Sequence, residues 1–384
     1  MQTLLVILLS LLALGWLAQG IRAWRGMKKI PRLSKIPPRA GDSPPRVSIL
    51  LAARNEAEKL RAALESMLAL DYPNFEVIAV DDRSDDATPQ ILRDLAARSP
   101  RLKTARIETL PPGWLGKPHA LETAYGLSTG EFLLFTDADI WFAPDVLSRA
   151  VALTEENHWD HLTLAVGMDL RGFWENTVLS YIQFGFVFGV QPWRVSDPRS
   201  GCYMGVGAFQ LVRKKVYEAI GTHKRLAMEV VDDMKLGKLV KQNGFASGTA
   251  SSDNLIRVRW QEGIRNVIKG MTKNLFAGLG FSASQSVFTA AMLLLISVVP
   301  FAALPFTHGW ARLAAAISVV TAVTVHGRLF HETGHSFFYG LTQPLGAFVF
   351  VYMIYRSMIL TLWRGGIVWR DTFYPLAELR KGSV

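Results

Sequence analysis

The chain has 384 residues, of which 50% are hydrophobic, and a formal net charge of +10. This length accommodates one large soluble domain together with membrane segments. The single cysteine, Cys202, excludes an internal disulfide framework and fits a reducing compartment.

The N-terminus predicts a membrane anchor over residues 1–22. Residues 4–17 form an apolar run, and the basic residues follow this run, which is the reverse of the order in a cleaved signal peptide. We therefore expect a retained helix whose basic flank stays on the cytoplasmic side. Five prolines within the basic linker, residues 23–45, predict an extended tether.

Residues 46–250 carry the pattern of a parallel α/β sheet. Residues 47–53 predict a buried strand, a helical pattern follows to about Leu70, and residues 75–80 predict a second strand. Two strands with a helix-length connection indicate a βαβ unit. Neither a G-x-G-x-x-G fingerprint nor a G-x-x-x-x-G-K-[ST] phosphate loop occurs in the sequence. A bound nucleotide would therefore be held by side chains and metal.

A third apolar run, which begins at Leu133, ends in Asp137 and Asp139. In an extended segment, residues i and i+2 point to the same side. Paired hard oxygen ligands suit Mg²⁺ or Mn²⁺, which complete their coordination with water and substrate phosphates. The pattern predicts a metal–diphosphate site at the end of a strand, with a solvated turn as the alternative.

Five short motifs, taken in order, resemble those of the family 2 inverting glycosyltransferases, which have the GT-A fold. The motifs are Ala53-Arg-Asn-Glu56, Val80-Asp-Asp-Arg-Ser-Asp-Asp86, Gly116-Lys117, Thr136-Asp-Ala-Asp139 and Val231-Asp-Asp-Met-Lys-Leu-Gly237. The resemblance covers about residues 45–245. It implies an α/β catalytic domain with a Rossmann-like, mixed and mostly parallel sheet, accompanied in this chain by N-terminal and C-terminal transmembrane helices.

The same resemblance implies which residues bind the nucleotide sugar. Arg54 and Asp82 would contact the base or the ribose, and Lys117 would lie near the nucleotide. The full set of expected donor-binding residues is Ala53, Arg54, Asn55, Glu56, Asp82, Lys117 and Asp137.

By the same resemblance, Asp137 and Asp139 would hold the metal, and Asp233 would be the catalytic base with Asp232 beside it. The family more often has Glu at the position of Asp232, which leaves the role of Asp232 open. Displacement of a nucleoside diphosphate from a sugar needs charge compensation on the leaving phosphates. The acceptor hydroxyl loses its proton as it attacks, and a carboxylate on the opposite face can take that proton, with inversion. The alternative for Asp232 and Asp233 is a solvated first turn of a helix.

Two further segments are predicted to meet the membrane surface. Residues 173–193 are apolar and aromatic-rich but interrupted by polar residues, so an interfacial helix and a packed core helix both fit. Residues 251–284 predict an interfacial helical segment, in which Arg265, Lys269 and Lys273 share one face. That face is either solvated or paired with the leaving group or anionic lipid.

The segment around Trp260 also indicates which members of the family this chain resembles. Many processive polysaccharide synthases of the family carry Gln-x-x-Arg-Trp here, and this chain does not. Residues 260–274 and 369–374 resemble instead membrane glycosyltransferases that modify carotenoid acids, hopanoids or ceramide-like lipids.

Residues 285–365 predict two or three transmembrane helices. Three segments are apolar, and prolines interrupt or flank them: residues 287–306, 311–325 and 345–363. The middle segment is short of the about 20 residues that a span needs, so it is re-entrant or extends through His326. Basic residues in the C-terminal tail, residues 366–384, favour a cytoplasmic C-terminus, which three full spans after the catalytic domain would contradict.

One motif predicts a different class of protein. His331-Glu-Thr-Gly-His335 matches H-E-x-x-H, which on a helix places two histidines on one face for zinc. A membrane zinc metalloprotease is therefore an alternative function, although Gly334 disfavours a helix and no clear third ligand follows. A processive polysaccharide synthase of the same fold is the other alternative.

We therefore predict a multi-pass protein of the cell membrane whose catalytic domain faces the cytoplasm. It would transfer a sugar, with inversion, from a nucleotide-sugar donor to a lipid or membrane-embedded acceptor. We expect a UDP-sugar as the donor and Mg²⁺ or Mn²⁺ as the cofactor, and no nucleic-acid partner.

Overall fold

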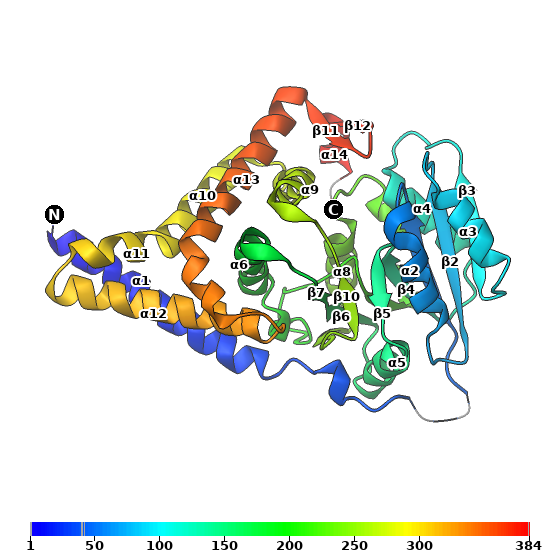
Figure 1. Ribbon diagram of the computed structural model, residues 1–384, viewed down its shortest axis with the longest axis horizontal. Helices are drawn as coiled ribbons and strands as arrows, with labels where there is room; N and C mark the ends of the chain where they lie inside the picture. Colours follow the sequence, from blue (N-terminus) through cyan, green and yellow to red (C-terminus); the bar gives the residue numbers. More distant parts are fainter. Residues whose placement is uncertain (1, 40, 42, 383) are drawn as a thin grey trace. The chain divides into compact units, whose positions relative to one another are not determined.

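The structure is a computed structural model that describes residues 2–39, 41, 43–382 and 384. The chain divides into two compact units (Figure 1). The first, here called the α/β unit, comprises residues 30–169, 192–260 and 368–384. The second, here called the helical unit, comprises residues 1–29, 170–191 and 261–367.

In the described part of the chain, the α/β unit is built on a seven-stranded sheet of order β3-β2-β1-β4-β8-β6-β9. The strands are β1 (Val47–Ala53), β2 (Phe75–Asp82), β3 (Leu102–Ile107), β4 (Phe132–Asp137), β6 (His161–Ala165), β8 (Gln210–Arg213) and β9 (Ser247–Ser251). Strand β8 runs antiparallel to β4 and β6, whereas β1 to β4 pair in parallel, as do β6 and β9. The predicted mixed, mostly parallel sheet is confirmed.

Both faces of this sheet are covered by helices. The helices of the unit are α2 (Ala57–Leu68), α3 (Thr88–Ala96), α4 (Gly116–Gly126), α5 (Val146–Glu156), α7 (Lys214–Ala219), α8 (Asp232–Gln242) and α14 (Leu376–Lys381). On β1, Ile49 and Leu51 pack into one core cluster with α2, α3 and α5, while Leu50 packs into the other with α4, α7 and α8. A strand buried on both faces is apolar at nearly every position, which explains the unbroken apolar run of β1.

Short strands make up the rest of the β structure in the described residues. Strands β5 (Ile140–Phe142), β10 (Ile256–Val258) and β7 (Gly167–Met168) form a small second sheet, and β11 (Gly366–Trp369) pairs with β12 (Thr372–Pro375). In the main sheet, Ala53 lies opposite Asp81 and Ala52 opposite Asp137. The polar residues that follow β1, β2 and β4 therefore meet at one edge, where parallel sheets bind ligands.

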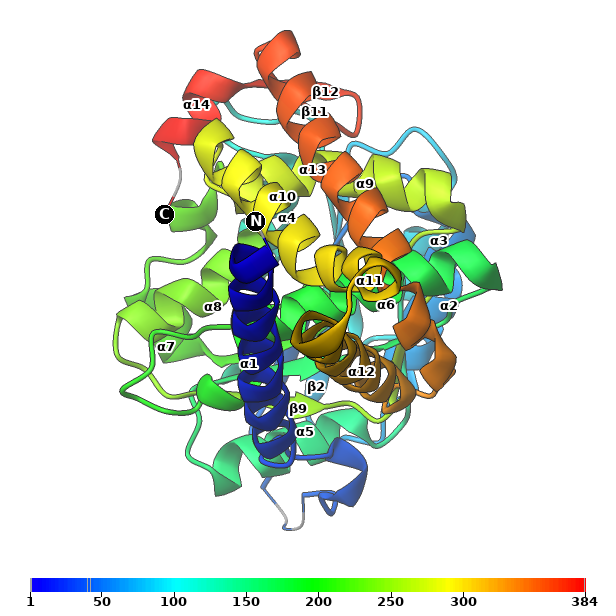
Figure 2. The same cartoon turned by 90° about the vertical axis from the view of Figure 1, so that its left-hand side faces the viewer.

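The helical unit contains the apolar helices. They are α1 (Gln2–Met27), α6 (Gly172–Val190), α9 (Gly263–Gly278), α10 (Ala283–Ser297), α11 (Val299–Ala303), α12 (Gly309–His331) and α13 (Gln343–Arg364). Helix α1 lies along α12, with Leu9 and Ala13 in one buried cluster with Ala311 and Ala315 (Figure 2). The small alanine side chains let the two helix backbones approach closely.

Within the described residues, three helices are long and apolar enough to cross a membrane: Gln2–Met27, Gly309–His331 and Phe337–Arg364. A fourth crossing results if α9 and α10, which are bent by 116° at their junction, count as one broken span. The predicted middle segment thus extends through His326. The segment predicted over residues 287–306 is not one continuous helix, because α10 ends at Ser297 and Pro300 lies in the short helix α11.

Helix α6 corresponds to the aromatic-rich segment for which two alternatives were open. Its buried side chains include Val178, Tyr181 and Phe184, and the helix packs against α12 and α13. Phe173 and Trp174, in its first turn, are about half exposed. Most of α6 is therefore a packed helix of the helical unit.

The H-E-x-x-H motif lies at the end of a helix. Helix α12 ends at His331, and Gly334 has a φ of +89°, so the two histidines do not share a helical face. The ring of His335 stacks on Phe330, with centroids 4.5 Å apart. The zinc metalloprotease alternative therefore has no support in the fold.

Candidate active site

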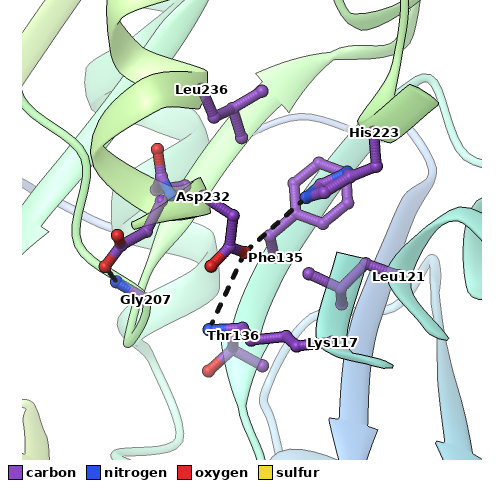
Figure 3. Close-up of a pocket in the computed structure, with 10 residues that line it drawn as sticks. Lys117, Leu121, Phe135, Thr136, Gly207, His223, Asp232 and Leu236 are labelled. Atoms are coloured by element: carbon purple, nitrogen blue, oxygen red, sulfur yellow. Dashed lines mark hydrogen bonds and ion pairs between the residues drawn. The ribbon is translucent and has the colours of Figure 1, made fainter. Parts of the chain in front are cut away.

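The candidate site lies at the edge of the sheet where β4 ends and where α4 and α8 begin. A small cavity there is lined by polar residues from these elements and from the loops beside them (Figure 3). The polar residues are Lys117, Thr136, Gln210, His223, Asp232 and Asp233. The structure thus brings Lys117 together with Asp232 and Asp233, which lie more than 110 positions later in the sequence.

Lys117 is the cation of this cavity. Its Nζ lies 2.6 Å from Asp137 Oδ1 and 4.0 Å from Asp232 Oδ2. Burial lowers the pKa of Lys117, but the negative charges of Asp137, Asp232 and Asp233 outweigh burial and raise the pKa above its ordinary value. Lys117 therefore stays charged, which fixes a positive charge where a leaving diphosphate would accumulate negative charge.

Asp139 lies in the turn after β4, close to Asp137. Burial and then the charges of Asp137 and Glu56 raise the pKa of Asp139 to about 7. A carboxyl group beside another carboxylate is harder to ionise, because the two negative charges repel each other. A bound divalent cation would supply the positive charge that stabilises both. The oxygen donors of Asp137 and Asp139 therefore fit Mg²⁺ or Mn²⁺.

These two carboxylates would not fill the coordination shell of a metal. Among the residues that the structure describes, no group of three or more His, Cys, Asp or Glu side chains could hold a metal ion. A metal at Asp137 and Asp139 would take its other ligands from water and phosphate oxygens, as Mg²⁺ usually does.

Gly207, in the loop before β8, lies beside two of the carboxylates, those of Asp137 and Asp233. A Cβ on Gly207 would lie 2.6 Å from Asp137 Oδ2, closer than real Cβ contacts. The Gly207 N–H donates a hydrogen bond of 2.9 Å to Asp233 Oδ2. A glycine at this position therefore allows the loop to approach Asp137 while it orients Asp233.

The two predicted catalytic carboxylates differ in exposure. Asp232 is 4% exposed, and its Oδ2 lies 3.9 Å from His223 Nε2. Asp233 is less buried, and its Oδ1 accepts a 2.8 Å hydrogen bond from the Met234 N–H. Because a catalytic base has to reach a hydroxyl that enters from outside, Asp233 is the better placed of the two.

His223 was not expected at this site from the sequence. Burial, and then the positive charge of Lys117, lower the pKa of His223 to about 3. Its Nδ1 lies 2.6 Å from the Tyr217 hydroxyl. His223 is therefore a neutral imidazole that faces Asp232, and no motif or spacing in the sequence indicated it.

The residues after β1 and β2 form a charged cluster at the same edge. Arg54 Nη1 lies 3.8 Å from Asp82 Oδ2, and Arg83 Nε donates a 2.8 Å hydrogen bond to Asp82 Oδ1. A Cβ on Gly116, the first residue of α4, would lie 2.1 Å from Asp82 Oδ2. Of these residues, Arg83 stood in a matched motif but had no expected role.

Three other expected donor-binding residues, Ala53, Asn55 and Glu56, do not line the cavity. Asn55 has a φ of +53°, and its Oδ1 accepts a 2.9 Å hydrogen bond from the Asp85 N–H. The Glu56 N–H donates a 2.9 Å hydrogen bond to Thr88 Oγ1. The side chain of Ala53 is fully buried in the core, so only its backbone could reach a ligand.

The sequence of this chain is similar to those of known glycosyltransferases. Residues 48–221 match the sequence family described as Glycosyl transferase family 2. The chain is 32% identical over 181 residues to a beta-monoglucosyldiacylglycerol synthase of Trichormus variabilis, covering 46% of this chain and 37% of that protein. It is 22% identical over 243 residues to a 4,4'-diaponeurosporenoate glycosyltransferase of Staphylococcus haemolyticus, covering 62% of this chain and 64% of that protein.

Among solved structures, the fold is similar to that of the mannosyltransferase PcManGT from Pyrobaculum calidifontis, solved in complex with GDP-Man and Mn²⁺. The TM-score is 0.53, with 19% identity, and the match covers 93% of this chain and 99% of that chain. At this identity the likeness concerns the fold. The chain spans between about a third and two thirds of the length of the two curated relatives.

Proposed function

We propose that this chain, whose residues 48–221 match glycosyltransferase family 2, transfers a sugar from a nucleoside-diphosphate donor to a lipid acceptor with inversion. The observation that carries the proposal is the convergence of Lys117, Asp137 and Asp233 at the ends of the parallel strands. Positive charge for a leaving group and a carboxylate for an incoming hydroxyl stand at one edge of the sheet. These are the two requirements of a single displacement.

Each residue of the site has one task in this proposal. Arg54 and Asp82 bind the nucleoside, and Lys117 binds the leaving diphosphate. Asp137 and Asp139 hold Mg²⁺ or Mn²⁺, which when bound supplies charge compensation to the phosphates.

The acceptor hydroxyl gives its proton to Asp233 as it attacks the anomeric carbon. The loop N–H of Gly207 orients the Asp233 carboxylate for this transfer. Asp232, which is buried beside His223 and near Lys117, holds Lys117 in place instead of acting on the acceptor.

The acceptor is proposed to be a membrane lipid. Two observations support this: the chain has apolar helices long enough to span a bilayer, and two curated relatives are named for lipid or carotenoid products or substrates. The exposed Arg265 and Lys269 on α9 would contact anionic headgroups. We further propose a multi-pass topology with the catalytic unit in the cytoplasm, from the basic residues that follow the first apolar run.

The donor is proposed to be a UDP-sugar, and a GDP-sugar is the alternative because the mannosyltransferase of similar fold was solved with GDP-Man. Membranes that contain the protein are supplied with labelled UDP- or GDP-sugars, and the products are separated by organic extraction. We expect label on a species with one or two sugars in the organic phase, formed about 100-fold or more slowly by Asp233→Asn. A long water-soluble polymer would instead identify a processive polysaccharide synthase, and no transfer from any donor would refute the proposal.

A further inference from the structure

The C-terminal residues of the chain reach the donor-binding edge of the α/β unit, to which residues 368–384 belong. Strands β11 and β12 form a hairpin whose two connecting residues are Arg370 and Asp371. The Arg370 guanidinium donates hydrogen bonds to the carbonyl oxygen of Arg54 and to the carboxylate of Glu56. Both partners belong to the loop that follows β1.

A second residue of the hairpin contacts the next loop. Tyr374, on β12, is 6% exposed, and its side chain lies close enough to Arg83 to help Asp82 raise the pKa of that guanidinium against the effect of burial. Arg83 in turn donates to Asp82 through two of its nitrogens. One hairpin therefore contacts the loops after both β1 and β2, which carry the nucleoside-binding residues.

The conformation of the hairpin tip is unusual for its sequence. Arg370 and Asp371 have φ angles of +48° and +63°, so both are left-handed. Two-residue hairpin turns with two positive φ angles prefer Gly, Asn and Asp, so Asp371 is acceptable there, whereas a larger side chain such as that of Arg370 is strained. A hairpin that only had to be stable would not place arginine at this position. Arg370 keeps this strained conformation, and from it the arginine side chain reaches Arg54 and Glu56. Because strained residues often occur at functional sites, we take this contact to be functional.

We propose that the C-terminal hairpin is a clasp that positions the two nucleotide-binding loops, so that donor affinity depends on Arg370 and Tyr374. The inference rests on the proposed function, because it names what holds the donor-binding residues of that same site. Arg370 and Tyr374 are positioning residues: they act through Arg54, Glu56 and Arg83. The segment that follows the last apolar helix in the sequence thereby becomes part of the donor site.

The first test measures donor KM and kcat for the full-length protein and its variants. Arg370→Ala removes a charge-assisted contact with Glu56, so we expect donor KM to rise at least about tenfold with kcat within about twofold. Arg370→Lys should recover only part of the affinity, because an ammonium group lacks the fork that reaches two acceptors. Tyr374→Phe should raise KM in the same way. Lys381→Ala, an exposed cation in the same tail, is the control and should leave both constants unchanged.

A second variant separates positioning from hairpin stability. Arg370→Asn with Asp371→Gly gives the tip its preferred residues, so the protein should unfold at or above the wild-type temperature. If the clasp positions the loops, donor KM in this double variant is raised as in Arg370→Ala. A wild-type KM in the double variant, in Arg370→Ala and in Tyr374→Phe would overturn the inference.

A binding measurement distinguishes this failure from failure of the proposed function. Binding of UDP and GDP to the wild-type protein is measured with Mn²⁺ present. If the wild-type protein binds neither and transfers no sugar, the proposed function fails and the clasp fails with it. If the wild-type protein binds one of them and the variants bind it equally well, only the clasp is wrong.

Discussion

Helix α4 allows a test of the proposed donor site, because it begins and ends with a glycine. The same glycine-to-alanine change can therefore be made at both ends of the helix. A Cβ at Gly116 would lie 2.1 Å from Asp82 Oδ2 and 3.0 Å from Arg83 Nη2. A Cβ at Gly126, the last residue of α4, meets nothing within 4 Å. Gly116→Ala and Gly126→Ala therefore differ only in what the added methyl group displaces.

The expected magnitude follows from these contacts. In Gly116→Ala the Asp82 carboxylate has to retreat by at least about 1.3 Å, from 2.1 Å to the 3.4 Å at which ordinary van der Waals contact begins, which breaks its 2.8 Å hydrogen bond with Arg83. A hydrogen bond between charged groups contributes about 1.5–3 kcal/mol. If Asp82 binds the nucleoside and Arg83 holds the Asp82 carboxylate in position, binding of the nucleoside diphosphate should weaken by about 10- to 100-fold.

The assay is titration of UDP and GDP into the purified protein, with thermal unfolding measured alongside. Gly126→Ala should bind as wild type and gain up to about 1 kcal/mol in the free energy of unfolding, because alanine favours the helix. If Gly116→Ala bound UDP and GDP with wild-type affinity, the assignment of the donor site to this edge of the sheet would be refuted.

Three further predictions concern the carboxylates and the core. Asp139→Asn should abolish metal-dependent transfer while the fold persists, and Asp137→Asn should reduce it severely; full activity of Asp139→Asn in EDTA would exclude the metal site. Asp233→Asn should cut kcat by about 10² or more with donor binding nearly intact, and a dead Asp232→Asn beside an active Asp233→Asn would reverse our assignment. Burial lowers the pKa of His161 to about 4, so the unfolded chain binds an extra proton as pH falls below the ordinary histidine pKa. Stability should therefore be full above about pH 6.5 and fall by about 2 kcal/mol by pH 5, as urea unfolding would measure, and the drop should shrink in His161→Asn.

The sequence predicted the sheet well because its signals are local. A run such as residues 47–53 is apolar at nearly every position since both of its faces are covered. Asp137 ends a strand, and Asp139 lies in the turn after it. Whether these carboxylates bind a metal stays a prediction. Prolines were expected to interrupt or flank the segment over residues 287–306, and its long helix does end just before Pro300.

The parts of the candidate site that the sequence did not indicate come from distant segments. His223 meets Asp232 through the packing of a loop against α8, and nothing in its neighbours marks it as special. Arg370 contacts Arg54 across more than 300 residues of chain. Such pairs depend on the tertiary path of the chain, and motif spacing carries no information about them.

The pairing of α1 with α12 has a consequence for how the protein is made. Leu9 and Ala13 leave the ribosome well before Ala311 and Ala315, which lie about 300 residues later. At about 5–20 residues per second, roughly 15–60 seconds of synthesis separate the two helices. In the proposed multi-pass topology, the inner face of α1 is without its α12 partner during this interval, and lipid can solvate leucine and alanine without cost. The apolar composition of that face therefore suits the proposed topology, in which α1 is inserted in the bilayer before α12 is translated.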